Sequence, residues 1–322
     1  MPTRIEISYK TILFTAAFLL LLWFLWQIID IILILFLAFI LMSALRPLVQ
    51  KLEKIGVPRL LSILIIYLTF LISLGALGGA IFPLLINQTL RFWEKIPELA
   101  SRILTFLPLN FEFMTQQLTP VSGDILRVTV GLFSNIFTLV TFLVFTFYLL
   151  LEREDLEKTF VSFLGQDSGK KLVLLLGKIE ERLGSWVRGQ LLLMFLIGLV
   201  TYIGLVALGI DYALPLAITA GILEIVPFAG PILSGIPAVL VALVTSPALA
   251  LAVVALYFII HQSEGNLIVP TVMRKAVGLS PIVTLLALMI GGKLAGIFGA
   301  LLAVPTVVIL QVILQEVTAE KK

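Results

Sequence analysis

The chain has 322 residues, of which 60% are hydrophobic and 13% are charged. Soluble globular domains are about 45–50% apolar and about 25% charged, so a water-soluble fold of this length could not bury so much apolar surface. The shortage of charge indicates a protein whose outer solvent is lipid. The formal net charge is +3, and the basic residues lie between apolar runs. This pattern favours a positive-inside arrangement of loops over a nucleic-acid-binding surface.

Several chemistries are excluded by residue type. The chain contains no cysteine, which excludes disulfides, thiolate metal sites and cysteine nucleophiles. Its single histidine, His261, cannot form a two-histidine metal site. Because His261 ends an apolar run, we interpret it as an interfacial packing residue, with proton transfer as the alternative. No hydrolase, zinc-protease or P-loop motif occurs, so we expect no enzyme, no cofactor and no metal site.

The first apolar runs follow one another closely. Residues 11–29 and 31–45 are interrupted by only two polar side chains, so they form either a tight hairpin or one long helix, and the second run ends at Pro47. The first run is too long for the apolar core of a signal peptide, and we interpret it as a retained span. The basic stretch at residues 46–59 is expected in the cytoplasm. Residues 60–86 form the third span.

The middle of the chain alternates between polar and apolar segments. Residues 87–127 mix acidic and basic side chains with three prolines, which predicts a water-exposed segment on the non-cytoplasmic side. Residues 128–151 form the fourth span. Residues 152–188 carry seven basic side chains, with apolar residues at helical spacing, so we predict a cytoplasmic amphipathic helix. The fifth span begins at Gln190.

The last hundred residues are apolar but rich in glycine and proline. Proline removes an amide donor from a helix, and irregular backbone at membrane depth survives only where protein or a watery cavity covers it. We therefore predict two broken or re-entrant elements, around residues 224–237 and 291–305. The helix breaks are expected at Gly235, Pro237, Gly291, Gly292, Gly296 and Pro305.

These features divide the chain into six parts. They are residues 1–86, a membrane hairpin and third span; 87–127, a non-cytoplasmic amphipathic segment; 128–151, the fourth span; 152–188, a charged cytoplasmic helical segment; 189–316, a transport core; and 317–322, a cytoplasmic tail. We predict an all-α integral membrane protein, a polytopic helical bundle of about seven to eight spans. Its broken or re-entrant helices lie in the C-terminal half, and both termini are cytoplasmic.

Glu224 is the leading candidate for a transport site because it lies in an apolar stretch, far from any charged loop. A carboxylate at the bilayer centre costs about 2.5–3.5 kcal/mol on insertion scales, so such a residue usually faces a cavity, pairs with a cation or carries a proton. The alternative is that the chain break brings Glu224 close to the interface, where it caps a half-helix. Pro227, Gly230 and Pro231 are expected to form the break that a binding site would use.

Further polar residues complete the predicted pathway. Gln262, Glu264, Asn266 and Pro270 either line one mouth of the pathway or mark an ordinary transition from span to loop. Lys293 lies between two apolar runs. It either pairs with Glu224, which would lower the cost of burying both charges, or reaches towards the lipid headgroups.

The C-terminal half resembles the AI-2E (autoinducer-2 exporter, PerM-like) family of bacterial transporters. Residues 224–231 (EIVPFAGP) are similar to the family's E-x-x-P-x-x-G-P segment, and residues 264–270 (EGNLIVP) to its acid-x-N-x-x-x-P segment. Residues 278–281 (GLSP), 291–299 (GGKLAGIFG) and 303–305 (AVP) resemble the stretches that follow in the same order. The N-terminal half matches the family in its layout of spans.

The resemblance implies an eight-span-like transporter of the bacterial inner membrane with re-entrant elements, assembled as a homo-oligomer, namely a pentamer. Some members export autoinducer-2, and others are credited with sodium/proton antiport. Phe228 and Ser280 stand where the family often has tyrosine and histidine. The expected partners are the lipid bilayer, a small polar solute or ion, and further copies of the chain, with no nucleic acid.

The leading functional hypothesis is a secondary permease that exports a small polar molecule such as autoinducer-2, driven by its gradient or by protons. Half-helix ends around Glu224 would hold the solute, because their backbone groups are free. A second hypothesis is cation(Na⁺)/proton antiport with Glu224 as the exchangeable carboxylate. A third is a non-transporting membrane scaffold, in which the charged segments at residues 87–127 and 152–188 bind partner proteins.

Overall fold

The computed structural model describes residues 9–76, 78–79, 136–227, 229–269, 271 and 278–319, and all regular secondary structure in these ranges is helical. The elements are α1 (Tyr9–Gln27), α2 (Ile29–Lys54), a helix at Arg59–Ala76, α5 (Ile136–Leu164), α6 (Gln166–Ala207), α7 (Ala213–Leu223), α8 (Ala229–Thr245), α9 (Pro247–Ser263), the π-helix η1 (Glu264–Ile268) and α11 (Pro281–Ala319). The predicted segment at residues 87–127 and the predicted pathway residue Pro270 lie outside the described ranges.

Six helices within the described ranges are long and apolar enough to cross a membrane. They are Tyr9–Gln27, Ile29–Lys54, Arg59–Ala76, Gln166–Ala207, Pro247–Ile268 and Phe298–Ala319. Three shorter apolar helices accompany them, at Ala213–Leu223, Gly230–Thr245 and Ile282–Gly296. The prediction of an all-α polytopic membrane protein is therefore confirmed.

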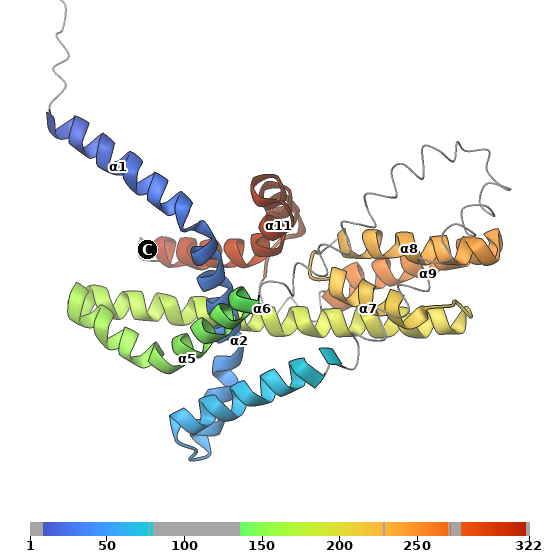
Figure 1. Cartoon of the computed structure of the whole chain (residues 1–322), viewed down its shortest axis with the longest axis horizontal. Helices are drawn as coiled ribbons and strands as arrows, with labels where there is room; N and C mark the ends of the chain where they lie inside the picture. Colours follow the sequence, from blue (N-terminus) through green and yellow to red (C-terminus); the bar gives the residue numbers. More distant parts are fainter. Residues whose placement is uncertain are drawn as a thin grey trace, which may run out of the picture.

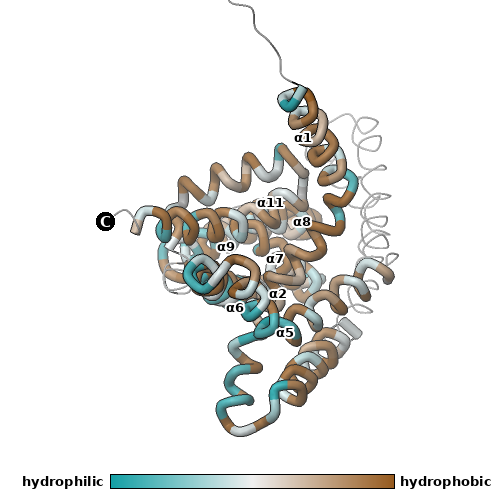
Figure 2. Tube along the Cα trace, turned by 90° about the vertical axis from the view of Figure 1, so that its left-hand side faces the viewer, coloured by the Kyte–Doolittle hydropathy of each residue, from teal (hydrophilic) through white to brown (hydrophobic). Residues whose placement is uncertain are grey.

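The long helix α6 packs against α2, α5, α7, α9 and α11 (Figure 1). Its 42 residues correspond to about 63 Å, twice the roughly 30 Å of a bilayer's hydrocarbon core. The predicted boundary between residues 188 and 189 falls inside α6, because Leu183, Trp186, Gln190 and Leu193 continue one buried stripe at helical spacing. Hydrophilic residues gather around α5 and α6, whereas α1 is hydrophobic almost throughout (Figure 2).

The N-terminal helices form one bent rod. α1 has no buried residue and points away from the other helices (Figure 1). At the bend, the Ile28 amide donates to the Phe24 carbonyl, and the Ile28 carbonyl accepts from the Ile32 amide, so the helical hydrogen bonds continue. Of the two predicted alternatives, a tight hairpin and one long helix, the structure therefore has the long helix. The second helix also extends past Pro47, where the sequence predicts its end, to Lys54.

Helix α2 tolerates Pro47 because α6 packs against the place where a hydrogen bond is missing. A proline cannot donate to the carbonyl four residues before it, which here belongs to Ser43. Gly184 of α6 approaches this carbonyl so closely that a Cβ atom at residue 184 would lie 2.2 Å from the Ser43 oxygen. The crossing of α2 and α6 therefore requires a glycine at residue 184.

Buried side chains form three clusters along α6 and its neighbours. One cluster joins α2, the 59–76 helix and α5 around Met42, Ile63 and Leu150. A second joins α2, α6 and the end of α11 through residues such as Leu183 and Val308. The third fills the space between α6, α7, α8 and α9, and its members are Leu205, Ile210, Ala213, Leu216, Ala238, Val241, Ala242, Ala250, Val253 and Tyr257.

Helix α11 is two helical arms joined by a sharp bend. Its backbone leaves helical geometry at Ala295 and at Gly296, which has φ 58° and ψ −138°. This left-handed conformation favours glycine. The arms then pack tightly, because a Cβ at Gly291 would lie 2.3 Å from the Gly299 oxygen. Of the predicted break residues here, Gly296 lies at the bend, whereas Gly291 and Gly292 are helical.

Three other predicted breaks require correction. Helix α8 runs through Gly235 and Pro237, and the second arm of α11 runs through Pro305. A single proline removes one backbone hydrogen bond, and tight packing compensates for that loss. Gly235 packs against the Tyr257 ring, and Pro305 is fully buried. The irregular backbone lies earlier instead, between the end of α7 at Leu223 and the start of α8.

Candidate functional site

The break between α7 and α8 depends on a close approach of the two chain segments. Glu224 follows the last residue of α7 and retains helical angles, with φ −60° and ψ −14°. Gly230 then packs directly against the end of α7, since a Cβ at residue 230 would lie 2.5 Å from the Leu223 carbonyl oxygen and 2.8 Å from the Glu224 nitrogen. Only a glycine allows α8 to start this close to the C-terminal end of α7.

Glu224 is buried at this break, with 1% of its surface exposed. The side chain of Gln190 on α6 donates from Nε2 to the Glu224 carbonyl oxygen, at 2.7 Å. Two buried oxygen atoms here, Glu224 Oε2 and Gln190 Oε1, have no hydrogen-bond partner among the described residues. Buried polar atoms normally have a partner, so these two oxygens remain available as acceptors.

A second carboxyl group lies against the first. Glu264 is the first residue of η1, is 3% exposed, and its carboxyl group lies close enough to that of Glu224 for the two to interact electrostatically. Two carboxyl groups this close repel each other when both are ionised, which favours a shared proton. Residues 189–268 contain no lysine or arginine, so within this stretch His261 is the one side chain that can carry a positive charge.

His261 connects this pair to the surface. Its Nδ1 atom lies 3.4 Å from Oε2 of Glu264, and its side chain is 39% exposed, compared with 5% for the Glu264 side chain. His261 and Tyr257 line a groove between α8 and α9 of about 440 Å³, whose other lining residues are apolar, including Pro231, Gly235 and Phe258. The single histidine of the chain therefore lies between an open groove and a buried acid.

The carboxyl pair lies near the point on α6 where the charged part of the helix ends, at Arg188, and the apolar part begins. Helices α7 and α9 pack against α6, and α8 packs on α7 and α9 (Figure 1). The hydrogen bond from Gln190 places Glu224 beside the first turn of that apolar half. The expected alternative, in which Glu224 only caps a half-helix, requires neither burial nor a second acid. The burial of Glu224 and its contact with a second acid therefore go beyond that role.

The other predicted pathway residues are more dispersed. Pro231 is buried and lines the groove, and Pro227 is half-buried at the break. Gln262 and Asn266 are exposed. Lys293 is also exposed, on the first arm of α11, and within the described residues it forms no ion pair with Glu224. The structure thus brings Glu224 and Glu264 together and leaves Lys293 apart from them.

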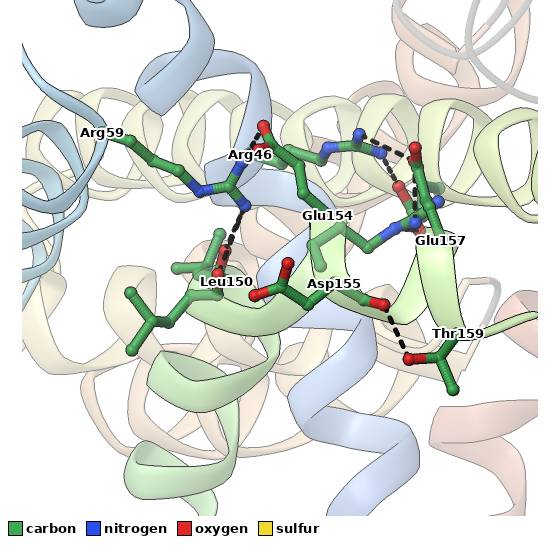
Figure 3. Close-up of polar contacts among 10 residues, drawn as sticks. Arg46, Arg59, Leu150, Glu154, Asp155, Glu157 and Thr159 are labelled. Atoms are coloured by element: carbon green, nitrogen blue, oxygen red, sulfur yellow. Dashed lines mark hydrogen bonds and ion pairs between the residues drawn. The ribbon is translucent and has the colours of Figure 1, made fainter.

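The structure contains a second buried polar cluster, which the sequence analysis missed (Figure 3). Glu180 of α6 accepts hydrogen bonds from Arg46 of α2 and from Arg153 of α5. Glu157 lies 2.8 Å from Arg153 Nη1 and 3.8 Å from Arg46 Nη2. Arg153 and Glu180 side chains are each only 4% exposed. Two arginines and two glutamates therefore join three helices as a nearly neutral network.

Arg59 extends this network to the 59–76 helix. It forms an ion pair with Glu154 and donates from Nη2 to the Leu150 carbonyl oxygen at 3.1 Å, as Figure 3 shows. The signal for the network was present in the sequence, because Glu180 lies three residues before Leu183 and seven before Val187, on the apolar stripe of α6. An acid on such a stripe predicts a buried partner.

Comparison with known proteins identifies the chain's relatives. Residues 12–319 match the AI-2E family transporter family. The chain is 30% identical over 282 residues to "Putative transport protein YrrI" of Bacillus subtilis, covering 80% of this chain and 78% of the relative. It is 24% identical over 290 residues to "Putative permease PerM" of Escherichia coli, covering 82% and 81%. Because the family match spans nearly the whole chain and the fold is a helical membrane bundle, this protein belongs to the AI-2E transporter family of membrane permeases.

Proposed function

We propose that the protein is a secondary permease that couples the passage of a small polar solute to a proton or a monovalent cation, held at the Glu224–Glu264 pair. The observation that carries the proposal is the contact between two buried carboxyl groups at a helix break. Intramembrane carboxyl groups of this kind are typical of proton relays and ion pathways. Broken helices at transport sites supply free backbone groups for the same purpose.

The electrostatics of the site favour positive charge. Glu224 follows the C-terminal end of α7, where the helix dipole is negative. The two unpartnered oxygens, Glu224 Oε2 and Gln190 Oε1, accept hydrogen bonds or bind cations. An anion would meet two acids and a negative helix end. The site therefore suits a proton, a cation or the hydroxyl groups of a neutral solute.

The finer parts of the proposal follow from the family. Autoinducer-2 is the first solute to test, because it is a small polar molecule and the family is described by its export. The relatives are bacterial, which supports placement in the cell's inner membrane. We also propose that both termini are cytoplasmic, that the protein assembles as a homo-oligomer, and that it transports the solute out of the cell.

Reconstituted full-length protein tests this function directly. Vesicles loaded with autoinducer-2 and a pH-sensitive dye report solute efflux and proton movement in the same sample. We expect efflux that accelerates when a proton gradient is imposed, and we expect Glu224→Gln and Glu264→Gln each to abolish the acceleration. Glu181→Gln is the matched control, because it removes an exposed acid from α6. Unchanged coupling in both site variants would show that the pair is not the coupling site.

Sodium/proton antiport is the second candidate, and the unpartnered oxygens favour it. Backbone groups at half-helix C-terminal ends coordinate Na⁺ or H⁺ in other transporters, and α7 ends in this manner beside Gln190. The same vesicles, without solute and with a sodium gradient, separate the two functions. Proton movement that follows sodium and disappears in Glu224→Gln would support antiport. Proton movement that requires the solute would support solute coupling.

A further inference from the structure

We propose that His261 is the relay through which protons reach and leave the Glu224–Glu264 pair. The proposal deepens the proposed function and rests on the pair being a protonation site. It concerns the route of the proton, which neither the family match nor the sequence motifs specify. Three groups carry it: an exposed imidazole, a buried acid beside it and a second buried acid beyond.

The two acids need a relay because water does not reach them directly. Glu224 is 1% exposed, and the Glu264 side chain is 5% exposed. The imidazole of His261 is 39% exposed and lies 3.4 Å from Glu264 Oε2. It also lines the groove between α8 and α9. A proton that enters from the groove therefore meets His261 before it meets either carboxyl group.

Few titratable side chains lie near His261, which makes it the best candidate for the relay. From Gly189 to Ile268, the side chains that titrate are Tyr202, Asp211, Tyr212, Glu224, Tyr257, His261 and Glu264. Helices α7 and α8 contribute no titratable side chain, and Tyr202 is the only one on this half of α6. Among the described residues of this stretch, the titratable groups near His261 are Glu264 on the following turn, Glu224 beyond it and Tyr257 one turn earlier. Of these side chains, imidazole is the one that exchanges protons readily near neutral pH.

The transfer balances in protons and charge. Nε2 of His261 accepts a proton from water in the groove, while Nδ1 carries the hydrogen that faces Glu264. The imidazolium then donates the Nδ1 proton to Oε2 of Glu264, which leaves a neutral imidazole protonated at Nε2. When Glu224 is ionised, Glu264 then passes this proton on to the neighbouring carboxylate of Glu224. Loss of the Nε2 proton to water and protonation of Nδ1 restore the starting state, and the net result is one proton moved from the groove to the pair.

The kinetics of carboxyl protonation test the relay without any cargo. Infrared spectroscopy of the full-length protein in lipid vesicles follows the carboxylic-acid band after a pH jump, and Glu224→Gln and Glu264→Gln assign the band. We expect His261→Ala to slow its appearance at least about tenfold, because a positioned proton-transfer group typically contributes about 10²–10⁴-fold. The final amplitude should remain, because the acids are still present. Free imidazole in the buffer should restore the rate through the open groove.

Controls separate a relay from a packing role. His261→Gln keeps a hydrogen-bonding side chain beside Glu264 but cannot carry the proton, so it should be as slow as His261→Ala. Tyr202→Phe removes a titratable group from the same helices and should exchange at the unchanged rate. A normal rate in either His261 variant, or a loss of amplitude that imidazole does not restore, would overturn the relay. Slow exchange in these variants together with uncoupled solute flux would leave the relay intact and reject the proposed function.

Discussion

Removing Glu180 should destabilise the protein more than removing any exposed acid on the same helix. In the network at the crossing of α2, α5 and α6, Glu180 accepts from both Arg46 and Arg153. Glu180→Ala leaves two arginines with Glu157 as their shared partner. Arg46 is 24% exposed and can recover some hydration, but the Arg153 side chain is 4% exposed and cannot. The substitution is costly because two arginines, one of them buried, then share a single carboxylate, which leaves an uncompensated positive charge in the buried network.

The expected magnitude follows from that burial. Breaking a buried ion pair by removing one partner costs about 3–5 kcal/mol. Each kcal/mol shifts Tm by roughly 2–4 °C in domains of 150–250 residues, so Glu180→Ala should lower Tm by at least about 6 °C. Thermal unfolding of the purified protein in detergent, followed by circular dichroism, measures the shift. Glu181→Ala is the control, because Glu181 is exposed one residue along α6, and it should leave Tm nearly unchanged.

A double variant checks that the cost comes from the unpaired charge. Replacing Arg153 by methionine in the Glu180→Ala background removes the buried positive charge that has lost its Glu180 partner. The double variant should be more stable than the sum of the single effects predicts, with a coupling of about 0.5–3 kcal/mol. Equal Tm values for Glu180→Ala and Glu181→Ala, or strictly additive effects, would refute the reasoning.

The remaining predictions concern backbone packing and one surface charge. Gly184→Ala should destabilise by about 1–3 kcal/mol, as overpacking does, because its Cβ would lie 2.2 Å from a carbonyl oxygen of α2. Gly177→Ala on the same helix has open space around it and should stabilise by about 0.5–1 kcal/mol; denaturant titration compares the two. Gly296→Ala should open the bend of α11, since φ is +58° there, and limited proteolysis would detect this as faster cleavage. The Lys158 ammonium holds the pKa of Asp155 below its usual 3.8. Any stabilisation from this pair is present at neutral pH and is lost as pH falls below 3.8, and Lys158→Met should raise the pKa measured by carboxyl NMR.

The sequence by itself determined the class of the protein and the region of its candidate site. Apolar runs of about 20 residues are long enough to cross a bilayer whatever their neighbours are, so the spans and the all-α fold could be predicted from composition and length. Glu224 stood out for the same reason, because a charge in an apolar stretch is costly wherever the chain places it. The glycines and prolines after residue 223 also predicted a break in the region of residues 224–237.

Only the tertiary structure decided which polar residues meet. The contact between Glu224 and Glu264 joins positions forty residues apart, and the Arg46–Glu180 pair joins positions 134 apart; neither spacing follows from a helical repeat. Packing also decided where helices break. Pro47, Pro237 and Pro305 remain inside helices, whereas Gly296 bends the chain because its conformation is left-handed. Local propensity gives the cost of an irregular residue, and the neighbouring helices determine whether the fold can offset that cost.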